Sequence, residues 1–137
     1  MDFMKPEYYR NRELSWIQFN ERVLGEARDK TLLLFERLKF LSITASNLDE
    51  FFMIRVASLK DMVNANYMKP DIAGMTPSMQ LEEISKKVHD LVGVQYSTLI
   101  RSLIPALRQN GLVFVREHED LDEEEAAFID EYFAENV

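Results

Sequence analysis

Apolar residues recur at three- and four-residue spacing along the first part of the chain, and this period predicts amphipathic helices. The first predicted helix covers residues 13–29 and the second covers 32–44. On the first helix, the face expected to be buried is formed by Trp16, Phe19, Val23 and Ala27, with Ile17 and Leu24 beside it. On the second, it is formed by Leu34, Phe35, Leu38 and Leu41.

A third helix is predicted over 48–64, after a polar joint at Ser46 and Asn47. Glu50 follows Asn47 by three residues, which is the spacing of a capping box. We therefore expect a turn at this joint, with Asn47 as the N-cap of the third helix. The apolar face of that helix is formed by Leu48, Phe52, Val56, Leu59 and Val63.

A loop is predicted over 66–77, because Pro70, Gly74 and Pro77 interrupt any regular pattern there. Thr76 before Pro77 is a typical helix start, with threonine as the cap and proline at the first helical position.

The helical pattern that follows runs over 77–110 and would be about 50 Å long at 1.5 Å per residue. Asn110 and Gly111 are a suitable C-terminal cap. Gly93 and Pro105 lie inside the pattern, and we expect them to bend or split the helix. Its buried face is predicted to contain Ile84, Val88, Leu91, Leu99, Leu103 and Leu107.

The pattern changes after Gly111. Residues 112–115 form a short continuous apolar run, which predicts a buried strand. Residues 121–133 then predict a helix whose first turn is acidic, as the helix dipole favours. We interpret 1–110 as an all-α antiparallel helical bundle with one long helix, and 111–137 as a short βα stub that opens the next domain.

Composition and charge limit the possible functions. Apolar residues make up 47% of the 137 residues, as in a globular protein, and cysteine is absent, so disulfides and thiolate metal sites are excluded. The net charge is −8, and residues 111–137 hold 10 acids against one basic residue. No dense basic stripe exists, so a nucleic-acid partner is not expected. With no apolar run of membrane-spanning length and no secretory signal pattern, a cytoplasmic location is expected.

The chain offers few candidate catalytic residues. His89, in the long helix, could be a phosphate carrier or general base, but a partly buried residue with a hydrogen bond is the favoured interpretation. His118 lies in an acidic segment and is expected to be a solvated surface residue. The acids 122–125 could bind a cation, although a solvated helix N-terminus explains them better.

Asn47 and Arg55 each have two interpretations. The Asn47 amide could serve only as a helix cap, or it could face outward and pair with the edge of a purine base. Arg55 lies beside the apolar face of the third helix, so its guanidinium needs a carboxylate, a phosphate or access to water. An internal ion pair is the favoured interpretation for Arg55.

Two long segments carry a family resemblance. "NRELSWIQFNERVLGEA" (11–27) and "LLLFERLKFLSITASNLDEFFMIRVASL" (32–59) closely resemble the N-terminal domain of bacterial polyphosphate kinases of the histidine-phosphorylating type. Over 61–110 the resemblance is mainly one of helical character, and 111–137 is similar to the start of the next domain of that family, the head. Many relatives have proline in the turn before the second helix, where this chain has Thr31 to Leu34. That difference leaves the start of the second helix open.

The resemblance implies a function for a longer protein. Family members transfer the terminal phosphate of ATP to polyphosphate and back through a phosphohistidine, with Mg²⁺. The phosphorylated histidine and the basic residues lie in their C-terminal catalytic domains, so the resemblance implies no catalytic or metal-binding residue in this chain and no activity for it alone. It implies that Asn47 contacts ATP on the adenine side. Membrane association of the full enzyme and a homo-oligomer are compatible with it.

A second function remains open beside the first. The domain could be a helical scaffold that packs against the C-terminal domains or another subunit, with no direct contact to the nucleotide.

Overall fold

The computed structural model describes residues 3–115, 117 and 120–137. In chain order the α-helices are α1 (Arg12–Arg28), α2 (Leu34–Phe51), α3 (Ala57–Asn64), α4 (Pro77–Thr98), α5 (Ile104–Gln109) and α6 (Glu123–Asn136). Two π-helical turns, Phe52–Val56 and Leu99–Leu103, follow α2 and α4, and a 3₁₀ turn covers Pro6–Tyr8. The chain forms two compact units, Met1–Leu103 and Ile104–Val137, each described by itself below.

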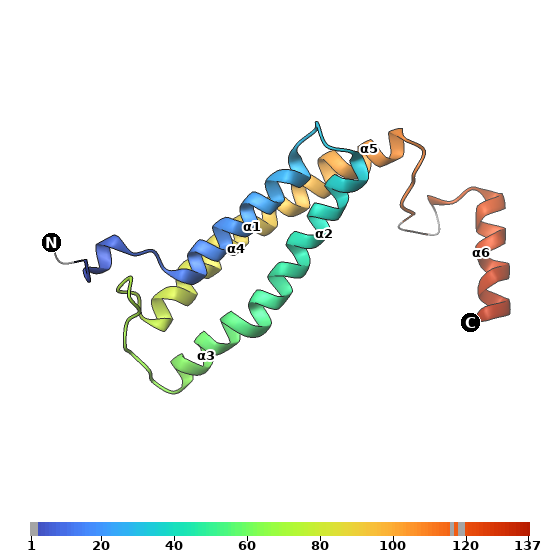
Figure 1. Cartoon of the computed structure of the whole chain (residues 1–137). Coiled ribbons are helices and arrows are strands. Elements are labelled where there is room, and N and C mark those ends of the chain that lie inside the picture. Colours follow the sequence, from blue (N-terminus) through green and yellow to red (C-terminus); the bar gives the residue numbers. More distant parts are fainter. Residues whose placement is uncertain (1–2, 116, 118–119) are drawn as a thin grey trace. The chain divides into compact units, whose positions relative to one another are not determined.

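The first unit is an antiparallel bundle of three helical rods. In Figure 1, α1, the rod made of α2 and α3, and α4 run alongside one another. α1 packs against both α2 and α4, and α3 packs against α4. The all-α bundle predicted from the sequence is therefore confirmed. Asn11 caps α1 by accepting a 2.9 Å hydrogen bond from the Leu14 N–H, and Thr76 caps α4, as predicted, by accepting from the Met79 N–H at 3.4 Å.

The turn predicted at Ser46 and Asn47 is wrong. α2 passes through both residues and continues through the π-turn into α3, so residues 34–64 form one rod. Asn47 is no helix cap, because its side chain bonds to a side chain of α1 and not to the backbone N–H of a first turn. The apolar residues before and after the joint stay in phase, and Leu41, Thr44 and Leu48 are all buried on one face. That continuous face outweighs the local capping signal.

The two π-turns change the phase of the buried face. Along the first rod the buried residues are spaced by three or four until Phe51, and the next buried residue is Val56, five positions later. On α4 the same step of five separates Thr98 from Leu103. A π-turn, with its i→i+5 hydrogen bonds, accommodates one residue more than an α-turn, which restores the face to the core.

The second π-turn lies just before Pro105, which has no N–H and whose ring would collide with the carbonyl four residues earlier in a regular helix. The predicted interruption of the long helix near Pro105 is thus confirmed. Gly93, by contrast, lies within an unbroken α4.

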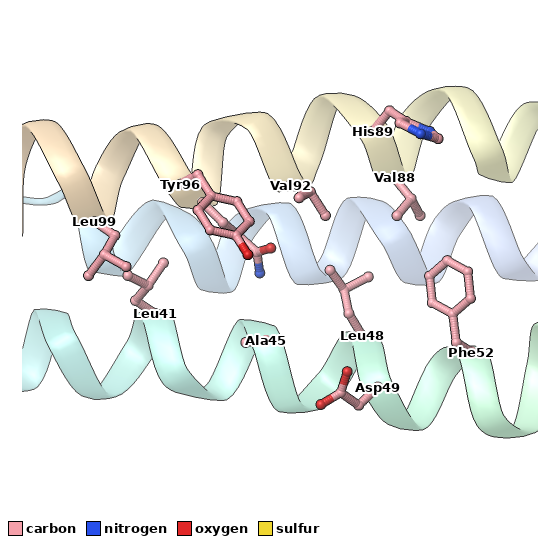
Figure 2. Close-up of a pocket in the computed structure, with 11 residues that line it drawn as sticks. Leu41, Ala45, Leu48, Asp49, Phe52, Val88, His89, Val92, Tyr96 and Leu99 are labelled. Carbon is pink, nitrogen blue, oxygen red and sulfur yellow. The ribbon is translucent and has the colours of Figure 1, made fainter. Parts of the chain in front are cut away.

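A groove lies between α2 and α4, with a volume of about 550 Å³. Figure 2 shows the side chains of α2 and α4 that line it, with His89 and Tyr96 on α4 and Asp49 on α2 among mostly apolar neighbours.

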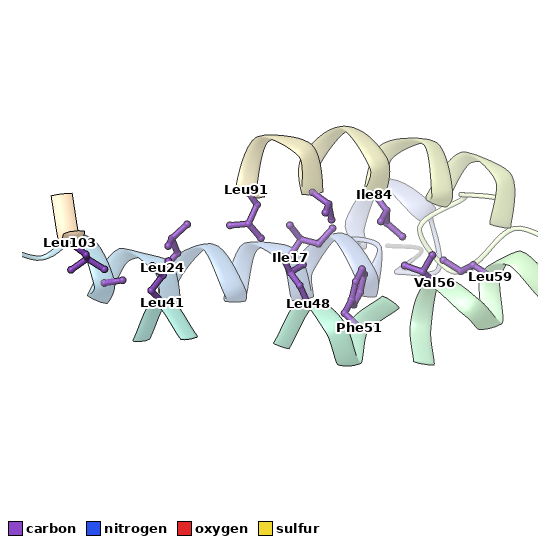
Figure 3. Close-up of a cluster of buried hydrophobic side chains, with 12 residues drawn as sticks. Ile17, Leu24, Leu41, Leu48, Phe51, Val56, Leu59, Ile84, Leu91 and Leu103 are labelled. Atoms are coloured by element: carbon purple, nitrogen blue, oxygen red, sulfur yellow. The ribbon is translucent and has the colours of Figure 1, made fainter. Parts of the chain in front are cut away.

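The core follows the length of α1. Figure 3 shows Ile17 and Leu24 of α1 among side chains of α2, α3 and α4. The buried face of α1 comprises Glu13, Ile17, Asn20, Leu24 and Ala27, so it is rotated from the predicted face, and Phe19 is 47% exposed. On the other helices the predicted core residues Phe35, Phe52 and Val63 are likewise exposed, whereas Ile84, Val88 and Leu91 are buried as predicted.

The second unit contains α5 and α6. Residues 112–115 have no strand partner and their apolar side chains are exposed, so the predicted strand, and with it the βα stub, is wrong for the described residues. Gly111 has φ +83° and ends α5, as its cap position predicted. The helix predicted over 121–133 is present as α6, whose N-terminus is held by a capping box between Asp122 and Glu125. The division into domains 1–110 and 111–137 stays a prediction.

Candidate functional site

Six side chains form a line of contacts between α1 and the rod of α2 and α3, which we call the α1–α2 seam. Three come from α1 and three from the facing rod, and they pair in antiparallel order: Asn20 with Asn47, Trp16 with Phe51, and Glu13 with Arg55. Residues three and seven apart share one face of a helix, which places the α1 members together.

Asn47 is held in place by a buried amide. Its Nδ2 donates to Oδ1 of Asn20 at 2.9 Å, and Nδ2 of Asn20 donates to the carbonyl of Thr44 at 3.1 Å. Asn20 is 0% exposed, whereas Asn47 is half-buried. Within the described part of the chain, Oδ1 of Asn47 has no hydrogen-bond partner, and Nδ2 retains a second hydrogen. The fixed amide can therefore offer one acceptor and one donor to a ligand.

The middle of the seam is an aromatic stack. The rings of Trp16 and Phe51 lie 4.3 Å apart between centroids and are inclined by 6°. Phe51 is 2% exposed and Trp16 is half-buried. The stack gives the seam a rigid apolar centre between two polar ends.

The far end of the seam is charged. Glu13 has a side chain only 8% exposed, and its Oε1 accepts from Nη2 of Arg12 at 2.8 Å. Its Oε2 lies 4.0 Å from Nε of Arg55, whose side chain is 44% exposed. Arg55 therefore has the carboxylate partner that was predicted, but the prediction of an internal ion pair is wrong, because the contact is long and Arg55 is open to solvent. Two guanidinium groups share one carboxylate, so the cluster carries a net charge of +1.

The sequence analysis did not identify Asn20 and Glu13 as members of the seam. Their positions could have indicated it, because each is a polar residue on the same helix face as Ile17, Leu24 and Ala27. A polar side chain buried on that face needs a hydrogen-bond or ion-pair partner.

His89 lies at the rim of the groove between α2 and α4 (Figure 2). It has the predicted hydrogen bond, with Nδ1 2.7 Å from the carbonyl of Ser85. The expectation that it is partly buried is wrong, because its side chain is exposed. His118, the other histidine, lies outside the described residues.

Gln95 is a second polar residue that sequence reasoning missed. It lines the groove, is 8% exposed, and its Nε2 has no hydrogen-bond partner among the described residues. The groove and Asn47 lie on different faces of α2, because Ala45, which lines the groove, is two positions from Asn47 and so about 200° away around the helix.

The described residues contain neither a candidate metal site nor a candidate membrane-spanning helix. Among them, no group of three or more His, Cys, Asp or Glu side chains is close enough to hold a metal ion. The acids 122–125 begin α6, where Asp122 and Glu125 are engaged in the cap. No helix in the described ranges is long and apolar enough to cross a membrane.

Comparison with known proteins gives consistent matches. The family model described as the polyphosphate kinase N-terminal domain matches residues 9–115. A polyphosphate kinase of Lactiplantibacillus plantarum is 53% identical over 97% of this chain, and one of Bacillus anthracis is 54% identical over 95%. The chain spans 18% of the length of each. The crystal structure of polyphosphate kinase from Porphyromonas gingivalis matches 91% of this chain and 17% of its own, with a TM-score of 0.69 and 32% identity.

Proposed function

The chain belongs to the polyphosphate kinase family, whose N-terminal domain it carries, and on that basis we propose that it works within a longer enzyme that transfers phosphate between ATP and polyphosphate. In that enzyme the α1–α2 seam contacts the adenine base of ATP through Asn47. The observation that carries this proposal is the fixed amide of Asn47, which retains a free acceptor and a free donor.

An asparagine amide suits adenine because it can accept from the exocyclic amine and donate to a ring nitrogen at once. Such a pair requires the amide plane to be held in one orientation. Asn20 supplies that constraint, since it is itself bonded to the Thr44 carbonyl in the core. The base contact therefore rests on a chain of two hydrogen bonds that begins in the bundle.

The remaining parts of the reaction are assigned to the rest of the enzyme. The phosphorylated histidine, the Mg²⁺ site and the basic residues along the polyphosphate path belong to the C-terminal domains, and the enzyme acts in the cytoplasm. Transfer needs a nucleophile and charge stabilisation at the phosphates. We therefore expect this chain alone to be inactive and to bind free ATP weakly, because one amide contact recovers little of the cost of association.

A scaffold role is the second candidate. It is favoured by the apolar groove between α2 and α4, which lies on a different face of α2 from Asn47. The two roles differ at Asn47. In the adenine role this side chain contacts the nucleotide base, whereas in the scaffold role it makes no contact with the nucleotide.

The test is Asn47→Ala in a full-length polyphosphate kinase that carries this segment. Loss of one base contact should raise the KM for ATP roughly fivefold or more when the assay is run well below the melting temperature of the variant. Asn64→Ala, which removes an exposed amide at the end of α3, is the matched control and should leave the KM unchanged. An unchanged KM in Asn47→Ala would leave the scaffold role.

A further inference from the structure

The amide of Asn20 could take two orientations, and its surroundings select one of them. Its Nδ2 lies 3.1 Å from the backbone carbonyl oxygen of Thr44, and both residues are 0% exposed. A backbone carbonyl can only accept a hydrogen bond, so it faces the NH₂ group of Asn20 and not the amide oxygen. The backbone of α2 therefore turns Oδ1 of Asn20 toward Asn47.

Asn47 receives the same polarity from Asn20. Oδ1 of Asn20 accepts from Nδ2 of Asn47 at 2.9 Å. In the reverse orientation of the Asn47 amide, its own oxygen would face the oxygen of Asn20, and two acceptors would meet with no hydrogen between them. The Thr44 carbonyl and the two amides thus share one direction of donation. It leaves the oxygen of Asn47 on the side that has no partner among the described residues.

An oxygen fixed in this way distinguishes two classes of purine by the exocyclic group at C6. Adenine carries an amine there, which donates, whereas guanine and hypoxanthine carry an oxo group, which accepts. An amide that is free to turn suits either class, because it can offer its oxygen to the amine or its NH₂ group to the oxo group. An amide that cannot turn suits only the amine.

The two asparagines differ in their access to a ligand. Asn47 is half-buried and can reach a base at the surface, whereas Asn20 is fully buried. Asn20 comes from α1, while Thr44 and Asn47 are three residues apart on α2 and so lie on one face of that helix. Asn20 can therefore act on a base only through Asn47, as a positioning residue.

We propose that Asn20 makes the nucleotide site selective for 6-amino over 6-oxo purines, by holding the Asn47 amide in the orientation that presents its oxygen to the base. The role of Asn20 rests on the proposed contact between Asn47 and adenine. A buried side chain that never touches the nucleotide thus sets which base is accepted, and the selectivity derives from a backbone carbonyl of α2.

The experiment uses a full-length polyphosphate kinase carrying this segment, with ATP as substrate and inosine triphosphate, the 6-oxo analogue of ATP, as a competing ligand. In Asn20→Ala the Asn47 amide is free to turn. The ratio of the inhibition constant of inosine triphosphate to the KM for ATP should therefore fall roughly fivefold or more. Asn20→Ser should also lower this ratio, because a hydroxyl can both donate and accept. It keeps a polar group in the core and serves if Asn20→Ala does not fold.

Two further variants separate orientation from stability. Asn20→Asp keeps an oxygen toward Asn47 whether its carboxyl is ionised or protonated, so the ratio should stay within about twofold of the parent enzyme even where the melting temperature falls. Thr98→Val removes a buried hydroxyl on α4, which donates to the Val94 carbonyl at 2.7 Å, and should leave the ratio unchanged.

The outcomes distinguish the role of Asn20 from the base contact itself. An unchanged ratio in both Asn20→Ala and Asn20→Ser would overturn the inference, as would an equal fall in Asn20→Asp. If the ratio is unchanged in the Asn20 variants while Asn47→Ala raises the KM for ATP, the base contact stands without the selectivity. If Asn47→Ala leaves the KM for ATP unchanged, the base contact fails and the selectivity fails with it.

Discussion

Replacing Asn20 by alanine tests whether the seam depends on a buried amide. Asn20 is fully buried and makes two hydrogen bonds, one to the Thr44 carbonyl and one from the Asn47 amide. At about 1 kcal/mol for each bond, with a further contribution from the space left in the core, Asn20→Ala should lower the free energy of unfolding by about 2–3 kcal/mol.

Asn47→Ala should cost less, about 1–2 kcal/mol, because it removes one bond and leaves the Asn20 oxygen buried without a partner. The two changes share that bond. The double variant should therefore be destabilised by about 1 kcal/mol less than the sum of the single variants.

Urea unfolding of the chain measures both quantities. Trp16 is the sole tryptophan and lies next to the two amides on the seam, so its fluorescence reports this region, while far-UV circular dichroism reports the helices as a whole. Asn64→Ala should stay within about 0.5 kcal/mol of the parent chain.

Strict additivity of Asn20→Ala and Asn47→Ala, or a loss below about 0.5 kcal/mol for Asn20→Ala, would refute the argument. The amide of Asn47 would then not be fixed by the core, and its suitability for adenine would lose its physical basis.

Two further predictions concern the same bundle. Phe51→Ala removes a buried ring from the stack with Trp16 and should lower the free energy of unfolding by about 3–5 kcal/mol in the same urea assay, whereas Phe52→Ala, at an exposed position, should cost far less. The backbone N–H and the hydroxyl of Thr31 donate to Asp29 and hold the pKa of its carboxyl below the ordinary value of 3.8. The contribution of the Asp29 carboxylate to stability is therefore present above the unfolded pKa and is lost as pH falls through the folded pKa. An NMR titration of the Asp29 carboxyl should show a midpoint below 3.8, and Thr31→Ala should raise that midpoint.

Much of the bundle could be predicted from periodicity, and the errors in the predicted buried faces have one origin. Ile84, Val88 and Leu91 are where a period of 3.6 places them. Phe19 and Phe52 were assigned to the core because they are large and apolar, whereas the true face of α1 includes the polar residues Glu13 and Asn20. Apolar size alone cannot fix the rotation of a helix when polar residues with partners occupy the face.

The joint at Asn47 shows the limit of local reasoning. Asn47 and Glu50 match a capping box in spacing, but the buried face of α2 continues through the joint, and the Asn47 side chain bonds to Asn20, which is far away in sequence. The short apolar run 112–115 failed for a related reason, since a strand needs a second strand, and none exists in the described residues. These local signals did single out Asn47, with a helix cap and a contact to a purine base as its two interpretations, and the family resemblance added the expectation that the base belongs to ATP.

The two π-turns have a consequence for sequence change. Because each accommodates one residue beyond the α-helical period, the loss of one residue within 52–56 can be absorbed by conversion of the π-turn to a regular α-turn. Phe51 and Val56 would then be four positions apart instead of five, so both would stay on the buried face, whereas a deletion elsewhere in the rod would turn everything after it by about 100°. Related chains can therefore be expected to lose one residue at these two places more readily than within the α-helices beside them.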